Sequence, residues 1–229
     1  MSIILNIDTA TDTASVSIAK NGEILAETTN DEPKNHGGFI QPAIQALLQN
    51  SHIYISDLSA VAISAGPGSY TGLRVGMASA KGLAFALNKP LITIATLDMM
   101  AYSAILQTGN DPAFAHSLFC PMIDARRMEV FTALFNKSLQ QIINPCTMVL
   151  DENSFANQLL KNKIFFLGNG SQKLKPFVGH RNATFLSVGS KALAMSKLSN
   201  NKYALNDFAN LAYSEPLYLK EFFGAIPRL

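Results

Sequence analysis

The spacing of hydrophobic and polar positions changes several times along the chain, and each change marks a predicted element. Three strands are predicted from buried or alternating runs at 3–9, 14–20 and 23–29. Asn21-Gly22, between the second and third runs, is a strong signal for a type I′ hairpin turn. Helical and strand-like patterns then alternate, and they predict elements at 36–50, 60–65, 72–88, 91–95 and 97–107. The first half of the chain is therefore predicted to have a βββαβαβα order.

The second half repeats this order. Its predicted elements are strands at 119–125, 129–136 and 142–150, a helix from Asp151 to about 162, a strand at 164–167, a short helical stretch, a strand at 185–188 and a final helix from Gly189. In both halves the first strand ends in an acid and a small residue, Asp8-Thr9 and Asp124-Ala125. We expect an α/β fold of two similar lobes with mixed sheets, facing each other across a cleft. The N-terminal lobe is predicted to span 1–107 and the C-terminal lobe 108–229, with the linker at 108–115.

Two glycine-rich turns follow predicted strands, one at 66–76 before the helix at 72–88 and one at 168–170. Backbone N–H groups at a helix start are unpaired and point outward, so such a turn suits anions and phosphates. The candidate phosphate-contacting residues of these turns are Gly66, Gly68, Ser69, Gly168 and Gly170. Ser69 and Tyr70 would also resemble a nucleophile pair, but no basic side chain lies near them in the sequence.

The helix at 72–88 is apolar almost all round, which is typical of a helix that is buried on more than one side. One stripe reads as an ordinary core face, Leu73, Met77, Ala80, Leu83, Ala84 and Leu87. A second face carries Ala78, Gly82, Phe85 and Ala86, edged by the cations Arg74 and Lys81. Glycine in a helix costs about 1 kcal/mol relative to alanine, and close approach of another backbone would explain that cost. Packing on this chain's own sheet explains Gly76. We interpret the second face as a surface for a partner, with burial within the chain as the alternative.

The composition narrows the classes of function that this chain can have. Charged residues make up 15% of the chain and the formal net charge is +2. Because no cluster of basic residues is present, a dedicated nucleic-acid surface is excluded, and any RNA contact is expected to be shared with another subunit. Two cysteines without close spacing read as free thiols. The N-terminus lacks the pattern of a signal peptide and no apolar run reaches about 18 residues, so we expect a cytoplasmic protein without a membrane span.

Several motifs together resemble the TsaB (YeaZ) family, in which the fold is that of actin-like ATPases, hexokinases and Hsp70. In chain order they are Ile7-Asp8-Thr9, His36 with Pro42, the run Gly66 to Gly76, Asp124-Ala125-Arg126 with Glu129-Val130, Gly168-Asn169-Gly170, and Glu215-Pro216-Leu217-Tyr218-Leu219. The run at 66–76 is the specific motif, and the others add weight by their order. The chain departs from the family at Gly37-Gly38, where Ser-Glu is usual, and at Arg127-Met128, where a small residue is common.

The resemblance implies a non-catalytic scaffold that binds a TsaD-like catalytic subunit in making threonylcarbamoyladenosine on tRNA. It implies a TsaE-like ATPase as a further partner through the complex, substrate supplied by TsaC, tRNA as an indirect partner, and a homodimer when the protein is alone. The contact would use the helix at 72–88 and the preceding helix, where Ile40 and Ile44 are candidate contributors. TsaD-like enzymes carry two metal-binding histidines four residues apart, and here Thr96 and Met100 stand at those positions. We therefore expect no metal and no cofactor.

Several alternatives are weighed against these expectations. The resemblance to actin-like ATPases implies that Asp8, Thr9 and Asp124 hold magnesium-bound phosphate, whereas strand-end acids can instead accept backbone N–H bonds in a tight turn. On the first interpretation the protein is an ATP-dependent transferase or ATPase that uses the cleft. Asp98 is either a carboxylate ligand or a charge at a helix start, and His36 is either a general base or a cap. A peptidase, implied by older naming, would need a histidine pair or a nucleophile motif that the sequence lacks.

Overall fold

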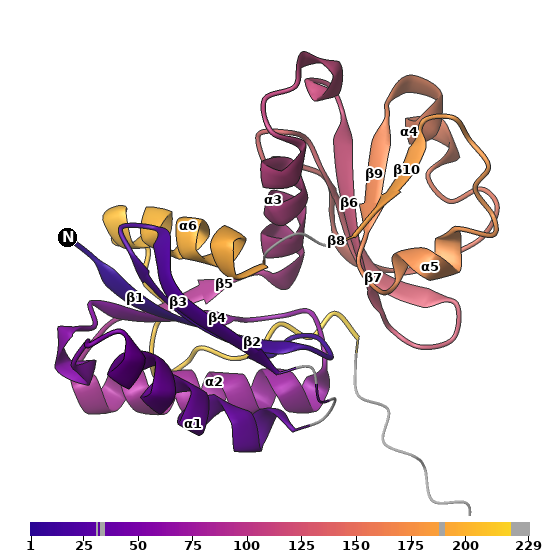
Figure 1. The fold of residues 1–229 in the computed structure, drawn as a ribbon. Helices are drawn as coiled ribbons and strands as arrows, with labels where there is room; N and C mark the ends of the chain where they lie inside the picture. Colours follow the sequence, from indigo (N-terminus) through magenta and orange to yellow (C-terminus); the bar gives the residue numbers. More distant parts are fainter. Residues whose placement is uncertain (31, 33–34, 188–190, 221–229) are drawn as a thin grey trace, which may run out of the picture.

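The computed structural model describes residues 1–30, 32, 35–187 and 191–220 (Figure 1). They form two lobes, each built on a five-stranded mixed sheet. The elements in the first half of the chain are β1 (Ile3–Asp8), β2 (Ala14–Lys20), β3 (Glu23–Asn30), α1 (His36–Asn50), β4 (Ala60–Ser64), α2 (Tyr70–Leu87), β5 (Leu91–Ile94) and α3 (Thr96–Thr108). Those that follow are β6 (Leu118–Asp124), β7 (Glu129–Phe135), β8 (Gln141–Val149), α4 (Ala156–Lys161), β9 (Ile164–Leu167), α5 (Ser171–Leu174), β10 (Ala183–Leu186) and α6 (Lys191–Ala204). Single 3-10 turns lie at Ile55–Asp57 and Pro112–Phe114.

The two sheets have the same topology. The strand orders are β3-β2-β1-β4-β5 and β10-β9-β6-β7-β8, so each sheet has three antiparallel meander strands followed by two parallel ones. Asn21 and Gly22, at the first hairpin, both have positive φ angles of 53° and 83°, as a type I′ turn requires. The predicted duplication of an α/β lobe is therefore confirmed.

The first sheet is buried on both faces, and its central strands β1 and β4 are buried at almost every position. Along β4, Val61 and Ile63 pack with α1 and α2, whereas Ala60 and Ala62 face α6. A strand covered on both sides reads as a continuous hydrophobic run instead of an alternating one. Figure 1 shows α1 and α2 under this sheet and α6 above it.

The last helix of each half packs on the other lobe, and this corrects the predicted domain boundary. Helix α6 was predicted to belong to the lobe at 108–229, but it packs on β1, β2, β3 and β5 of the first sheet. Helix α3 was predicted to belong to the lobe at 1–107, but most of its apolar residues pack on β6, β7 and β9 of the second sheet. The physical reason is that each apolar helix stripe is buried by the facing sheet, which sequence order does not specify.

Other differences are local. The predicted helix from Asp151 is shorter, because Asp151 instead accepts bonds from Asn153 N and Ser154 Oγ in a turn. The strand predicted at 185–188 is β10, and the predicted start of the last helix at Gly189 lies outside the described residues. Cys120 and Cys146 are both free, and burial raises the pKa of the Cys120 thiol to about 12. No helix in the described part of the chain is long and apolar enough to cross a membrane.

Candidate functional site

The acid at the end of β1 is held by a lysine from the far end of the chain. Asp8 is buried, and its Oδ2 lies 2.7 Å from the Nζ of Lys191 at the start of α6. Asp8 Oδ1 accepts bonds from Ser64 Oγ at 2.6 Å and from Ala10 N at 3.0 Å. Burial raises the pKa of Asp8, but the Lys191 ammonium and these bonds outweigh it and lower the pKa below its usual value. The carboxylate is therefore ionised and already paired.

The acid at the end of β6 has a matching arrangement. Asp124 Oδ1 lies 2.7 Å from the Nζ of Lys173 on α5 and accepts a bond from Arg126 N at 2.6 Å. Partial burial raises the pKa of Asp124, and the bonds from Lys173 and Arg126 lower it further than burial raises it. Both strand-end acids accept backbone N–H bonds in tight turns, which confirms that interpretation of their position. The two lysines were missed, because nothing in the local sequence marks a partner so far along the chain.

The space beside the glycines at 66–76 is filled by other atoms of this chain. A Cβ added to Gly68 would lie 2.1 Å from Ala10 O, and one added to Gly72 would lie 2.2 Å from Thr9 O. Ser69 N also donates to Ala10 O at 2.7 Å. Gly76 would meet Thr9 Oγ1 at 2.2 Å, so its explanation by close packing within the chain is confirmed. These glycines let α2 lie directly against the turn that follows β1.

The turn at 168–170 is filled in a similar way. Gly168 has a φ of +92°, and a Cβ there would lie 2.3 Å from Met122 O and 2.5 Å from Met100 Cε. Gly170 N donates to Met122 O at 3.1 Å. Met100 and Thr96, which replace the expected histidine pair, are both buried in the first turns of α3. Among the residues that the structure describes, no group of three or more His, Cys, Asp and Glu side chains is arranged to hold a metal ion.

The remaining catalytic candidates take part in local structure. His36 is buried, and its Nε2 lies 3.1 Å from Thr11 O, so the ring ties the start of α1 to the turn after β1. Ser69 caps α2 by accepting a bond from Gly72 N at 3.3 Å. The Tyr70 ring lies 4.0 Å from the guanidinium of Arg74. The Ser69 hydroxyl is therefore engaged as a helix cap, and His36 Nε2 is engaged with a backbone carbonyl.

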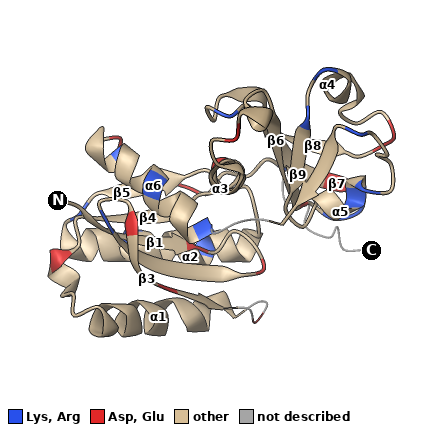
Figure 2. Cartoon of the chain, turned by 45° about the horizontal axis from the view of Figure 1, so that its top comes forward, with Lys and Arg blue, Asp and Glu red and all other residues tan. Residues whose placement is uncertain are grey.

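The second face of α2 is exposed, as its helical spacing predicts. Phe85 is 79% exposed, and a Cβ added to Gly82 would meet no atom within 4 Å. Ala78, Ala86 and Arg74 are also exposed, and Lys81 is half-buried. Helix α1 lies beside α2 and carries no charged residue along its length, so it is drawn entirely in tan in Figure 2. The two helices together present a surface with few charges.

Two predictions about this face need correction. Ile40 and Ile44 are only 1% and 3% exposed and pack in the core beneath α1, so they are not available to a partner. Arg74 and Lys81 contact this chain's own C-terminal segment. Arg74 Nε donates to Tyr218 Oη at 3.0 Å, and Lys81 Nζ donates to Ser214 O at 3.0 Å.

That segment, residues 209–220, runs from one lobe to the other, and we call it the strap. It begins on the first sheet, where Ala209 N donates to Leu91 O at 2.9 Å. It then passes along α2 and the end of β4, where Leu217 N donates to Ala65 O at 2.7 Å. On the second sheet, Leu219 O accepts a bond from Thr147 Oγ1 at 3.1 Å, and Lys220 forms an ion pair with Glu129. The strap therefore connects the exposed face of α2 to the second lobe.

Comparison with known proteins agrees with this architecture. A family model described as TsaD, tRNA N6-adenosine threonylcarbamoyltransferase, matches residues 23–219. The protein named tRNA threonylcarbamoyladenosine biosynthesis protein TsaB from Bacillus subtilis is 32% identical over 181 residues, which are 76% of this chain and 74% of that protein. The chain belongs to the TsaB (YeaZ) family. The TsaB of Escherichia coli is 29% identical over 95% of this chain and 94% of its own length.

Solved structures show the same fold. YeaZ from Pseudomonas aeruginosa superimposes with a TM-score of 0.79 at 24% identity, covering 96% of this chain and all (100%) of that one. A polyphosphate/ATP-glucomannokinase from Arthrobacter gives a TM-score of 0.51 at 10% identity, covering 89% of this chain and 100% of its own. The two-lobed fold of sugar kinases and actin-like proteins is thus shared.

Proposed function

We propose that this protein acts in threonylcarbamoyladenosine biosynthesis as a non-catalytic subunit that binds and stabilises a TsaD-like catalytic subunit. The observation that carries the proposal is the exposed face of α2, with Phe85 standing 79% exposed beside the open side of Gly82. Burying a phenylalanine side chain contributes about 2 kcal/mol to association, and Gly82 lets a partner backbone approach closely. Relatives named TsaB support the pathway, and the TsaD-family match supports a partner of related fold.

The surroundings of this face are polar but carry no charge on α1. The exposed side of α1 carries Gln41, Gln45, Gln49 and Asn50, which are polar and uncharged. A surface with few charges does not select against a partner by repulsion, so shape and apolar burial decide affinity. The same face on a second copy would be self-complementary, and this supports a homodimer when the catalytic subunit is absent. A TsaE-like ATPase and tRNA are proposed to join through the complex.

Two ion pairs support the absence of catalysis by this subunit. Magnesium-bound phosphate at the strand ends would require Asp8 to leave Lys191 and Asp124 to leave Lys173, since both lysines lie at 2.7 Å. The alternative, an ATP-dependent transferase or ATPase in the cleft, has a direct test. Tight binding of Mg-ATP by calorimetry, with turnover that an Asp8→Ala variant loses, would replace our proposal.

The partner surface is tested by mixing the protein with a TsaD-like subunit and measuring the mass of the complex in solution. Gly82→Arg and Ala78→Glu place long or charged side chains on the exposed face, where both fit the monomer. Each variant is expected to keep its fold, by circular dichroism, and to lose the complex. Leu160→Glu is the matched control. Leu160 is also exposed, at 72%, but it lies on α4 in the second lobe. A complex that forms unchanged with both face variants would show that the partner binds elsewhere.

A further inference from the structure

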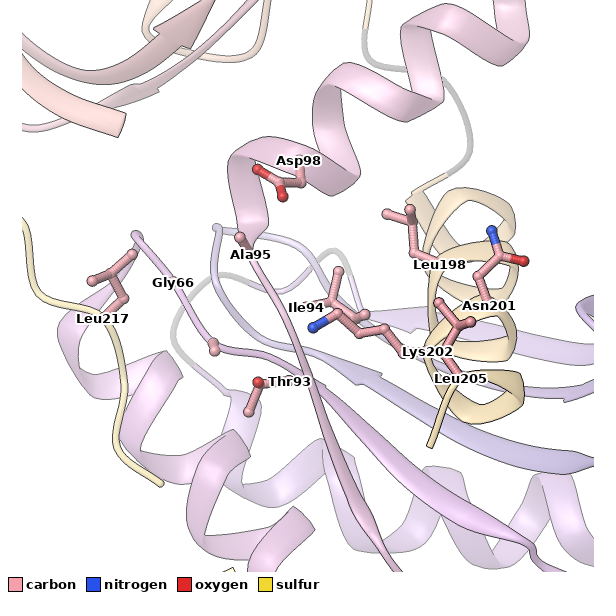
Figure 3. A pocket seen from close by; sticks show the side chains of 11 residues that line it. Gly66, Thr93, Ile94, Ala95, Asp98, Leu198, Asn201, Lys202, Leu205 and Leu217 are labelled. Carbon is pink, nitrogen blue, oxygen red and sulfur yellow. The ribbon is translucent and has the colours of Figure 1, made fainter. Parts of the chain in front are cut away.

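A cavity lies at the carboxyl ends of β4 and β5, on the side of the first sheet away from α1 and α2 (Figure 3). Its volume is about 320 Å³, which is within the range of about 300–1,000 Å³ for small-molecule sites. Ligands of open α/β sheets bind outside the carboxyl ends of parallel strands, and this cavity occupies that position. The exposed face of α2 is separate from it, so the cavity does not belong to the proposed partner surface.

The walls come from four parts of the chain that are distant in sequence. Most of the lining is apolar, contributed by Ala65, Ile94, Ala95, Leu198, Leu205 and Leu217. The polar lining groups are Thr93 on β5, Asp98 on α3, and Asn201 and Lys202 on α6. Since Leu217 belongs to the strap, the strap closes one side. An apolar hollow with a few convergent polar groups is the usual form of a site for an amphipathic small molecule.

The charges in this cavity do not balance. Asp98 forms no ion pair with any described residue, and its Oδ1 is buried without a hydrogen-bond partner. Figure 3 shows the Lys202 ammonium directed into the hollow below Asp98, but Lys202 Nζ lies 2.9 Å from Asp207 Oδ2. One cation is thus shared between two carboxylates. Burial raises the pKa of Asp98, and the Lys202 charge with a bond from the neutral Gln141 only partly opposes it.

This imbalance selects the class of ligand. Asp98 is half-buried and its Oδ1 has no hydrogen-bond partner, so a bound cation would offset part of the cost of burying that oxygen. With two carboxylates, Asp98 and Asp207, and one ammonium, Lys202, the local net charge is −1, which disfavours an anion. A neutral apolar molecule would fill the hollow but would leave the carboxylate oxygen without a partner. A molecule with one ammonium group and a hydrocarbon body satisfies both parts of the cavity.

We propose that this cavity binds a small primary amine, with its ammonium on the Asp98 carboxylate and its hydrocarbon body against Leu198, Leu205 and Leu217. Because Oδ1 is buried, the Asp98 carboxylate must turn toward the hollow for this atom to accept a bond from the ammonium. Ligand binding there would also contact the strap through Leu217. The site is independent of the proposed scaffold role, and its test uses the isolated full-length protein.

The probe is benzylamine, compared at neutral pH with benzyl alcohol and benzoate, which match its shape but are neutral or anionic. Calorimetry is expected to show saturable one-to-one binding of benzylamine only. Asp98→Asn keeps the shape of the side chain and is expected to weaken binding at least tenfold. Lys202→Met removes the competing cation and is expected to tighten it. Glu152→Gln, an exposed acid in the second lobe, is the matched control and should bind as the unmodified protein does.

A second measurement locates the ligand without any variant. In the unmodified protein, benzylamine should shift the backbone amide resonances of residues 93–98 and 198–205 and leave those of α1 unchanged. The proposal would be overturned if benzyl alcohol bound equally well or if Asp98→Asn did not weaken binding. It would also be overturned if the resonance shifts mapped elsewhere, or if binding did not saturate at tens of millimolar.

Discussion

Lys191 Nζ lies 2.7 Å from Asp8 Oδ2, in a pair whose side chains are only 17% and 1% exposed. The pair joins the first strand of the chain to its last helix, α6. It also places the lysine where a magnesium-bound phosphate would need to approach the carboxylate. The same relationship recurs, closer to the surface, between Lys173 and Asp124. In both lobes the acid at the end of the first strand is therefore already paired with a cation.

Removing Lys191 is expected to destabilise the protein strongly. Lys191→Met leaves Asp8 buried without a cation, and breaking a buried pair in this way costs about 3–5 kcal/mol. The double variant Lys191→Met with Asp8→Asn should recover part of that loss, because no unpaired charge is left. Urea denaturation measures both. Lys197→Met is the control, since its pair with Glu23 is exposed and should contribute less than about 1 kcal/mol. A loss of that small size for Lys191→Met would contradict the assigned role.

Stability is expected to fall in acid because of Asp8. The folded-state pKa of Asp8 is lowered, so its contribution is complete above the unfolded pKa of about 4 and is lost as the pH falls through the folded value. The difference in unfolding free energy between the unmodified protein and Asp8→Asn should therefore be constant from pH 7 to pH 5. It should shrink below about pH 4. A difference that grows on acidification would show that Asp8 is not stabilised as its ionised form.

Two glycines of α2 give opposite predictions for the same substitution. Gly72→Ala would place a Cβ 2.2 Å from Thr9 O, so the helix or the turn must shift, and we expect a loss of about 1–3 kcal/mol. Gly82→Ala meets no atom within 4 Å and should gain up to about 1 kcal/mol from helix propensity. Thermal or urea unfolding of the two variants measures the contrast. Equal effects would mean that the turn after β1 does not pack on α2 as described.

The strap is expected to loosen when Lys81 is replaced. Lys81 Nζ donates to Ala212 O and Ser214 O, on either side of Tyr213, which is 83% exposed. Lys81→Met removes both bonds, so chymotrypsin should cleave after Tyr213 several times faster. Lys89→Met, just beyond the end of α2, is the control and should be cleaved at the original rate. An unchanged rate in Lys81→Met would mean that the strap is held by its sheet contacts alone.

Local patterns predicted the elements well. The hairpin at Asn21-Gly22 and the two faces of α2 follow from turn chemistry and helical period, which act within a few residues. The shortened α4 was missed because Asp151 stabilises a turn, and Phe155 at its N-cap has a φ of +63°, which no sequence signal indicates. Periodicity also shows which helix face is apolar without showing what covers it. For this reason Ile40 and Ile44 were assigned to a partner although the core buries them.

Contacts between distant segments could not be predicted at all. Lys191 lies at the start of α6 with no mark of its ion pair, and the strap contacts Arg74 and Lys81 through backbone carbonyls and one tyrosine hydroxyl. The cavity beside Asp98 needs four segments in place before it exists. The sequence predicts Asp98 as a carboxylate ligand or a helix-start charge, and it does not indicate that Lys202 and Asp207 lie on the same side of the sheet.

Because α3 and α6 each pack on the sheet of the other half, the molecule cannot be divided between its two halves. A fragment ending near residue 110 would carry the first sheet but not α6, which covers one face of it, and would expose the stripe of α3 that belongs on the second sheet. The complementary fragment would have the reverse defect. Each fragment alone would expose an apolar surface and fold poorly, whereas the two fragments produced together would assemble. The two halves of this duplicated chain therefore depend on each other for folding.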